Sequence, residues 1–309
     1  MLNNDGTVCT PGGFDCLDCK ETVTDGLAIP SPIQNIHILL SLRKVDRLMA
    51  PSEYLAKMYA ANGIPRAQIA VIRNGIDLAN FQRSRQERDV LTLGFIGFLG
   101  KHKGLDVLLH ALALLGDFGK VRLLVVGHGE EMDHLKALCL DLHLAPVVTF
   151  CWHVDHPAMA TMYEQIDGLI VPSICPENCP SVIGEAMASG IPVIASDIGG
   201  IRELVEPGIT GLLVPPGESR ALADAIERLR ADPALRRVMG EQARRNIQQD
   251  DLRIQAAHML AIFQELDAGR GVKRPCDVDI LLDDADHHWS AYLRQMMRTF
   301  AALEAQLSR

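Results

Sequence analysis

Six short apolar runs, each four to seven residues long, follow one another between residues 91 and 215. A continuous apolar run of this length is typical of a strand that is buried on both faces. Strands that alternate with helical segments predict a parallel sheet covered by helices on both sides. The runs occupy residues 91–97, 121–127, 147–150, 168–173, 191–196 and 211–215.

The segments between the runs support this α/β prediction. Apolar residues repeat at intervals of three and four in 105–115 and in 221–229, which places them on one face of a helix. We expect a helix after each run, and therefore a doubly wound, Rossmann-like parallel sheet. Ligands of such sheets bind beyond the carboxyl ends of the strands, so the residues that follow each run are the candidates for a site.

The two flanks are predicted to be smaller units. Before residue 74 we expect an irregular lead-in and then the remnant of a second α/β domain, with a helix over 33–45, a strand over 47–50, a helix over 52–61 and a strand over 69–72. After residue 249 we expect a helix to about residue 266, a polar linker and a last helix over 289–307. The apolar side chains of that last helix share one face, which we expect to pack against another chain or a missing domain. The predicted domains are 1–73, 74–249 and 250–309.

Charge and hydropathy exclude two classes of protein. A net charge of −9 argues against a nucleic-acid groove, because phosphate binding over many contacts needs a surplus of Lys and Arg. No stretch reaches the roughly 18 apolar residues of a spanning helix, and the N-terminus lacks a basic segment followed by an apolar core. We expect a cytoplasmic protein, with a peripheral position at the inner membrane face as the alternative.

Three of the eight cysteines, Cys9, Cys16 and Cys19, lie close together near the N-terminus. A closed structural zinc site needs four ligands, so zinc would need a fourth, either His37 or a cysteine of another chain. The alternative is a set of reduced thiols, and we predict no metal site.

The loop after the first run combines glycines with two lysines and opens directly into a helix. Gly97 and Gly100 let the backbone approach a ligand closely, and the helix N-terminus presents N–H groups. Lys101 and Lys103 add positive charge. These features predict a diphosphate site, and the alternative is a strand-to-helix turn with solvated lysines.

The loop after the fourth run carries Glu177, and the helix that follows carries Glu185 about one turn inside. Carboxylates accept hydrogen bonds from vicinal hydroxyls, which a nucleotide sugar has on its ribose and on its sugar. Pro180 fits the first helical position, and the N–H groups of Ser181 and Val182 would point at the diphosphate between them. The alternative is that Glu185 complements the helix dipole and that Glu177 is solvated.

These segments resemble glycosyltransferase family 4, the retaining transferases of the two-Rossmann-domain (GT-B) fold. The resemblance covers residues 49–249 and rests above all on PENCPSVIGEAMASG, followed by IPVIASDIGGIRELVEPGITGLLVPPG. It implies a UDP- or GDP-linked sugar as donor, no cofactor, and a glycan or lipid-linked acceptor of the kind used in polysaccharide biosynthesis.

The resemblance also implies roles for single residues. Lys103 is similar to the lysine that holds the donor diphosphate, and Glu177 to the glutamate that contacts the transferred sugar. Glu185 matches the glutamate that binds the ribose. Catalysis is thereby assigned to Lys103 and Glu177, with no protein nucleophile or metal required. The other residues expected at the donor site are Gly75, Gly97, Gly100, Lys101, Asn178, Pro180, Ser181 and Val182.

Two features depart from the family's pattern. Many members have an arginine directly after the glycine that ends the first strand, where this chain has Phe98. The family's complete fold also has an N-terminal acceptor domain of comparable size, of which only the final elements are recognisable. We therefore expect the chain to bind donor but to transfer sugar poorly by itself. A non-catalytic nucleotide-sugar-binding subunit that needs a partner chain is the alternative.

Local motifs also suggest three competing functions. A nicotinamide dehydrogenase would explain the glycines after the second run, but the third glycine is missing and the next strand ends at Cys151 instead of an acidic residue. Asp284-Ala285-Asp286 resembles a metal motif of another glycosyltransferase fold, and we expect a solvated charge run there. An epimerase shares the two-domain fold, but the Glu-x7-Glu spacing favours transfer.

Overall fold

The computed structural model describes residues 22–24, 27–29, 42, 44–81, 88–116, 118–152, 154 and 158–270. Three sequence predictions lie outside these ranges: the cluster of Cys9, Cys16 and Cys19, the Asp284-Ala285-Asp286 run and the helix over 289–307. Nearly all of the helix predicted over 33–45 lies outside them as well.

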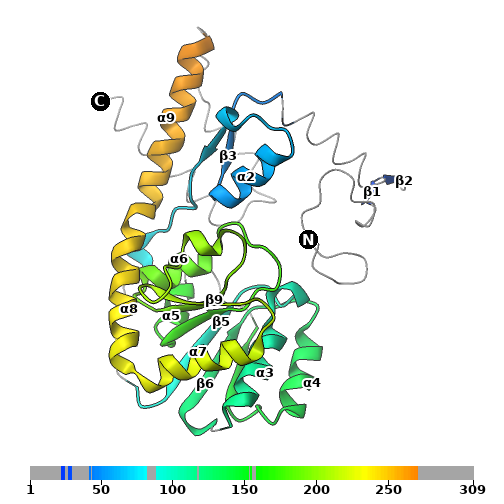
Figure 1. Ribbon diagram of the computed structural model, residues 1–309, viewed down its shortest axis with the longest axis vertical. Coiled ribbons are helices and arrows are strands. Elements are labelled where there is room, and N and C mark those ends of the chain that lie inside the picture. Colours follow the sequence, from blue (N-terminus) through cyan, green and yellow to red (C-terminus); the bar gives the residue numbers. More distant parts are fainter. Residues whose placement is uncertain are drawn as a thin grey trace.

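A parallel sheet of six strands forms the centre of the molecule (Figure 1). The order of its strands is β10-β9-β8-β5-β6-β7, and every neighbouring pair is parallel. The sequence prediction of a doubly wound sheet is therefore confirmed. The chain order reverses between β5 and β8, which makes this pair the topological switch point where such sheets bind ligands. The strands are β5 (Leu91–Ile96), β6 (Val121–Val126), β7 (Val148–Cys151), β8 (Gly168–Val171), β9 (Val193–Ser196) and β10 (Gly211–Val214).

Helices cover both faces of the sheet, and each face has its own apolar cluster. The first cluster joins the sheet to α3 (Leu105–Leu115), α4 (Met132–Asp141) and α7 (Ser219–Ala231). The second joins it to α5 (Met159–Tyr163) and α6 (Ser181–Ala188). The amphipathic segments predicted over 105–115 and 221–229 are both helical. The expectation of a helix after every strand is wrong at β9, where the short 3-10 helix η6 (Gly199–Glu203) and a loop lead to β10.

A small unit precedes the six-stranded domain. It consists of the parallel strands β3 (Leu48–Ala50) and β4 (Ile69–Val71), with α2 (Glu53–Ala61) and the 3-10 helix η1 (Arg66–Gln68) between them. Its apolar cluster is much smaller than the other two, as expected for a unit of this length. An antiparallel pair, β1 (Thr22–Thr24) and β2 (Leu27–Ile29), lies further toward the N-terminus.

The chain passes between the small unit and the six-stranded domain twice. It leaves β4 toward the 3-10 helix η2 (Leu78–Phe81), and it returns through α8 (Pro233–Asn246), the 3-10 helix η7 (Ile247–Asp250) and α9 (Leu252–Arg270). Figure 1 shows α9 running back to the small unit, on the side where β3 lies. An isolated parallel bridge joins Ile76 to Asp251, and Arg47 pairs with Glu265 at 3.1 Å. The two passages therefore lie side by side.

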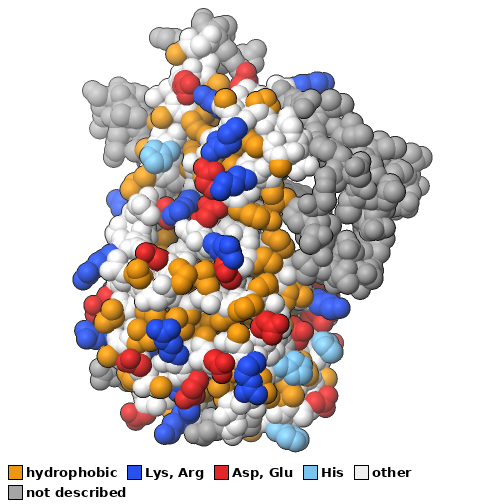
Figure 2. All heavy atoms as spheres, viewed as in Figure 1, with side chains coloured by type: hydrophobic (Ala, Val, Ile, Leu, Met, Phe, Trp, Pro, Cys, Tyr) orange, Lys and Arg blue, Asp and Glu red, His pale blue; other side chains and the backbone are white. Residues whose placement is uncertain are grey.

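Charges of both signs are interspersed over the face drawn in Figure 2, over the six-stranded domain and α9 alike. That face has no continuous basic stripe, in keeping with the net charge of −9. Among the described helices, none combines the length and the apolar composition needed to cross a bilayer.

Candidate functional site

Two loops meet at the carboxyl ends of β5 and β8. The first spans residues 97–104 and includes the 3-10 helix η3 (Lys101–Lys103), and the second spans 172–180. The backbone N–H of Ile174 donates to the carbonyl of His102 at 2.9 Å. Gly104 has φ of +70°, and a Cβ there would lie 2.1 Å from the carbonyl oxygen of Pro172. Only glycine therefore allows these two loops to approach so closely.

This approach brings together the two residues predicted to be catalytic. The ammonium of Lys103 lies 2.6 Å from Oε1 of Glu177, and the hydroxyl of Ser173 donates to the same oxygen at 2.9 Å. The two charged side chains are 27% and 18% exposed, so both are partly shielded from water yet open to a ligand. The sequence reasoning missed Ser173, although it is the second residue after β8, beside Pro172.

The positive charge of the first loop comes from its lysines. Burial lowers the pKa of His102, and the neighbouring Lys103 lowers it further, which favours a neutral imidazole. Lys101 is exposed, and so is Phe98, whose ring lies 6.3 Å from that of His102. Within the described part of the chain, no group of three or more His, Cys, Asp or Glu side chains is arranged to hold a metal ion.

Helix α6 begins at Ser181, with Pro180 in the N-cap position. The expectation of Pro180 at the first helical position is therefore wrong by one residue, because its ψ of 115° is extended rather than helical. Neither the N–H of Ser181 nor that of Val182 has a hydrogen-bond acceptor among the described residues. Two backbone donors at a helix N-terminus thus face the end of the sheet where Lys103 lies.

Glu185 lies on α6 above a buried tyrosine. The hydroxyl of Tyr163, on α5, donates to Oε2 of Glu185 at 2.7 Å. Burial and the nearby carboxylate hold the pKa of Tyr163 well above its usual value, so the hydroxyl stays protonated and remains a donor. Tyr163 is fully buried. The sequence reasoning missed it, because nothing in the pattern of α5 separates it from an ordinary core residue.

We expect Tyr163→Phe to lower the free energy of unfolding by about 1 kcal/mol, because the half-buried carboxylate of Glu185 loses a hydrogen-bond donor that water replaces only in part. Urea denaturation measures the loss. Tyr59→Phe is the matched control, since the Tyr59 hydroxyl has no hydrogen-bond partner within the described residues. Equal stability of both variants and the parent would contradict a supporting role for Tyr163.

Glycines also fix the remaining loops at this end of the sheet. Gly127, after β6, has φ of +145°, and a Cβ there would lie 1.8 Å from the carbonyl oxygen of Gly97. After β9, the N–H of Gly200 donates to the carbonyl of Glu177 at 2.7 Å. A Cβ on Gly200 would lie 1.8 Å from the carbonyl oxygen of Asn178. The backbone on both sides of the Lys103–Glu177 pair is therefore tightly held.

The segment around Gly75 reaches this region from the first passage between the units. The side-chain amide of Asn74 donates to the carbonyl of Cys179 at 3.0 Å. Gly75 itself is buried, and a Cβ there would lie 2.6 Å from the Cα of Leu252. Close packing against the start of α9 therefore explains why this position is a glycine. A contact of Gly75 with a ligand stays a prediction.

Two thiols lie in the second loop, those of Cys175 and Cys179. Burial raises the pKa of each thiol, which keeps both protonated near neutral pH. A protonated, shielded thiol is a poor nucleophile. The chemistry available at this site is therefore that of lysine ammonium groups, two carboxylates, hydroxyls and backbone N–H donors.

Two protein families match the chain. The family described as Glycosyl transferases group 1 matches residues 78–246, more than half of the 309 residues. The family described as Glycosyltransferase Family 4 matches residues 24–80. The boundary between the two matches lies near the first passage between the small unit and the six-stranded domain.

Curated relatives match over a similar part of the chain. A phosphatidyl-myo-inositol mannosyltransferase of Mycobacterium leprae is 32% identical over 199 residues, which cover 62% of this chain and 52% of that protein. A GDP-mannose-dependent alpha-mannosyltransferase of Mycobacterium tuberculosis is 34% identical over 198 residues, covering 60% of this chain and 49% of that protein. The chain spans about half the length of the curated relatives it matches.

Solved structures share the fold. Sucrose-phosphate synthase from Thermosynechococcus elongatus has a TM-score of 0.71 and 30% identity, with 77% of this chain and 62% of that chain covered. Anabaena HepE in complex with UDP and glucose has a TM-score of 0.69 and 25% identity, with 76% and 67% covered. This chain therefore shares its fold with both of these proteins.

Proposed function

The chain belongs to the glycosyl transferases group 1, and we propose that it binds a UDP- or GDP-linked sugar and transfers the glycosyl group with retention to a glycan or lipid-linked acceptor. The fold is that of GT-B glycosyltransferases, and we assign the donor to the six-stranded domain. The observation that carries the proposal is the Lys103–Glu177 pair at 2.6 Å, because it stands at the switch point of the sheet beside the open N-terminus of α6.

The donor fits this arrangement group by group. The diphosphate lies between Lys103 and the N–H groups of Ser181 and Val182, where a cation and two backbone donors converge. The transferred sugar lies against Glu177, and the ribose against Glu185. Ser173 and Tyr163 each donate to one of these carboxylates, and so orient them. The choice of a nucleotide sugar as the ligand is supported by the similar HepE protein, whose structure is in complex with UDP and glucose.

In the proposed reaction, an acceptor hydroxyl attacks the anomeric carbon as the glycosyl–phosphate bond breaks. The new bond forms on the face that the leaving group vacates, and the hydroxyl proton moves to the departing phosphate oxygen. The protein contributes by stabilising the developing negative charge with Lys103 and the α6 N-terminus. Glu177 holds the sugar in the orientation that the attack requires.

Titration calorimetry with UDP, GDP, UDP-glucose and GDP-mannose tests the donor assignment. We expect the parent chain to bind at least one nucleotide and its sugar derivative. Glu177→Ala is expected to weaken the binding of the sugar nucleotide about tenfold more than the binding of the bare nucleotide. The reason is that only the sugar loses a hydrogen bond to the carboxylate, a contact of about 1.4 kcal/mol. Glu241→Ala, which removes an exposed carboxylate on α8, is the matched control.

Two results would count against the proposal. The first is a parent chain that binds none of the four compounds. The second is a Glu177→Ala variant whose affinities for UDP and UDP-glucose fall by the same factor, because the carboxylate would then contact no part of the sugar. Release of nucleoside diphosphate with and without added acceptor separates transfer from binding alone.

A further inference from the structure

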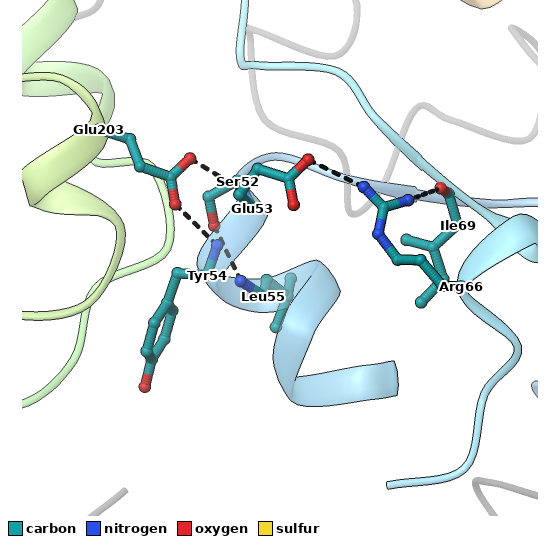
Figure 3. Close-up of polar contacts among 7 residues, drawn as sticks. All are labelled: Ser52, Glu53, Tyr54, Leu55, Arg66, Ile69 and Glu203. Carbon is teal, nitrogen blue, oxygen red and sulfur yellow. Dashed lines mark hydrogen bonds and ion pairs between the residues drawn. The ribbon is translucent and has the colours of Figure 1, made fainter. Parts of the chain in front are cut away.

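Glu203 joins the six-stranded domain to the small unit through hydrogen bonds to backbone. Its carboxylate accepts from the N–H of Glu53 at 2.9 Å and from the N–H of Tyr54 at 2.7 Å (Figure 3). These are the first two residues of α2. The third N–H of the helix, on Leu55, is accepted by the Ser52 hydroxyl at 3.2 Å. Helix α2 therefore takes two of its three N-terminal acceptors from a residue about 150 positions away.

The same short element that carries Glu203 holds the backbone of Glu177. Glu203 ends η6, and Gly200 is the second residue of that element. The N–H of Gly200 donates to the carbonyl of Glu177 at 2.7 Å, and a Cβ on Gly199 would lie 2.4 Å from that carbonyl oxygen. No side chain separates η6 from the loop, so a shift of η6 moves the Glu177 backbone with it.

The contact is also anchored from the first passage between the units. The guanidinium of Arg73 donates to the carbonyl of Glu203 at 2.9 Å and lies 3.4 Å from the carboxylate of Asp250. A Cβ on Gly200 would lie 3.1 Å from the Cβ of Ser52, so η6 packs directly against the N-cap of α2. Several contacts therefore fix α2 and η6 relative to each other. Among those described above, the Glu203 carboxylate is the charged group that contacts α2.

We propose that Glu203 is a positioning residue that sets the geometry of Glu177 by clamping η6 to the N-terminus of α2. This inference rests on the proposed function, in which Glu177 contacts the transferred sugar. It adds a consequence that the donor site by itself does not have: the affinity for the sugar part of the donor depends on the small unit. The bare nucleotide depends much less on it. The backbone of the Lys103 loop is held by hydrogen bonds from Leu99 N–H to His128 and from Ile174 N–H to His102, and α6 is held by its buried apolar side chains.

The readout is the sugar advantage, defined as the Kd of the bare nucleotide divided by the Kd of its sugar derivative. It is measured for UDP against UDP-glucose and for GDP against GDP-mannose, on the full chain. Glu203→Ala is expected to lower the sugar advantage by about fivefold while leaving the Kd of the bare nucleotide within about twofold. Glu206→Ala, an exposed carboxylate three residues later, is expected to change neither.

A second variant breaks the same contact from the side of α2. Glu53→Pro removes the N–H that donates to Glu203 and is compatible with the local backbone, because proline suits the first position of a helix and Ser52 already has φ of −154° and ψ of 154°. Glu53→Ala removes the same side chain but keeps the N–H. We expect Glu53→Pro to lower the sugar advantage and Glu53→Ala to leave it unchanged.

A double-mutant comparison decides between positioning and general loosening of the fold. In the Glu177→Ala background, Glu203→Ala is expected to have no further effect on the sugar advantage. Equal losses for nucleotide and sugar nucleotide, an additive double variant, or equal effects of Glu53→Pro and Glu53→Ala would each overturn the inference while leaving the donor assignment intact. A parent chain that binds no nucleotide would overturn both. If Glu203→Ala does not fold, the two Glu53 variants are sufficient to test the inference.

Discussion

Lys103→Ala is expected to weaken the binding of UDP or GDP by about 10- to 150-fold, equivalent to about 1.5 to 3 kcal/mol for a charge-assisted contact. Lys103 supplies the ammonium that the structure places at the switch point, 2.6 Å from Glu177. Its side chain is only 27% exposed, so water screens its charge less than that of a surface lysine. Phe98 stands where many family members have a second cation. We therefore expect the nucleotide affinity to depend more strongly on Lys103 in this chain.

The loss has a second cause that can be measured separately. Without Lys103, the carboxylate of Glu177 remains beside the diphosphate with no cation between them. We therefore expect the Lys103→Ala/Glu177→Ala double variant to bind the bare nucleotide more tightly than Lys103→Ala alone. Lys120→Ala is the control, because Lys120 precedes β6 at the opposite end of the sheet. A Lys103→Ala variant with the nucleotide affinity of the parent would show that the diphosphate lies elsewhere.

The sheet was predictable from sequence because most of its strands are buried on both faces, β7 at the edge being the least buried. In the sequence such strands form continuous apolar runs, and the six predicted runs correspond to the observed strands β5 to β10. The approach of the two site loops was predictable in outline, since the carboxyl ends of parallel strands meet at one edge of the sheet. The exception at β9 has a plain reason: apolar periodicity marks buried strands, but it does not dictate what connects them.

The supporting contacts of the site were not predictable in the same way. Tyr163 supports Glu185 from another helix, and Glu203 reaches α2 across a separation of about 150 residues. Both depend on how elements pack, and neither leaves a local pattern. Ser173 is intermediate: it is the second residue after β8, at the end of the sheet where a site was expected, but only the structure shows that it donates to Glu177.

Gly104→Ala is expected to lower the free energy of unfolding by more than about 3 kcal/mol, because two costs coincide at this position. The residue has φ of +70°, and its new Cβ would lie 2.1 Å from the backbone oxygen of Pro172. Backbone cannot rotate away as a side chain can, so one of the two site loops has to shift. Gly116→Ala has a backbone cost without the contact, since Gly116 also has φ of +70°, with ψ of −31° where Gly104 has 27°, and has no atom within 4 Å of the added Cβ. We expect it to lose about 1 kcal/mol.

The difference between the two variants measures the contact that brings Lys103 to Glu177. Urea denaturation followed by circular dichroism gives both losses, and calorimetry on the folded variants gives their nucleotide affinities. Gly104→Ala is expected to lose UDP or GDP affinity as well as stability, because displacing either loop separates the ammonium from the N-terminus of α6. Gly116 lies at the opposite end of α3 from Gly104, and Gly116→Ala is expected to bind UDP or GDP like the parent chain. If the two alanine variants lost equal stability, the conformation of Gly104 alone would explain its effect, and the close approach of the loops would not be what positions Lys103.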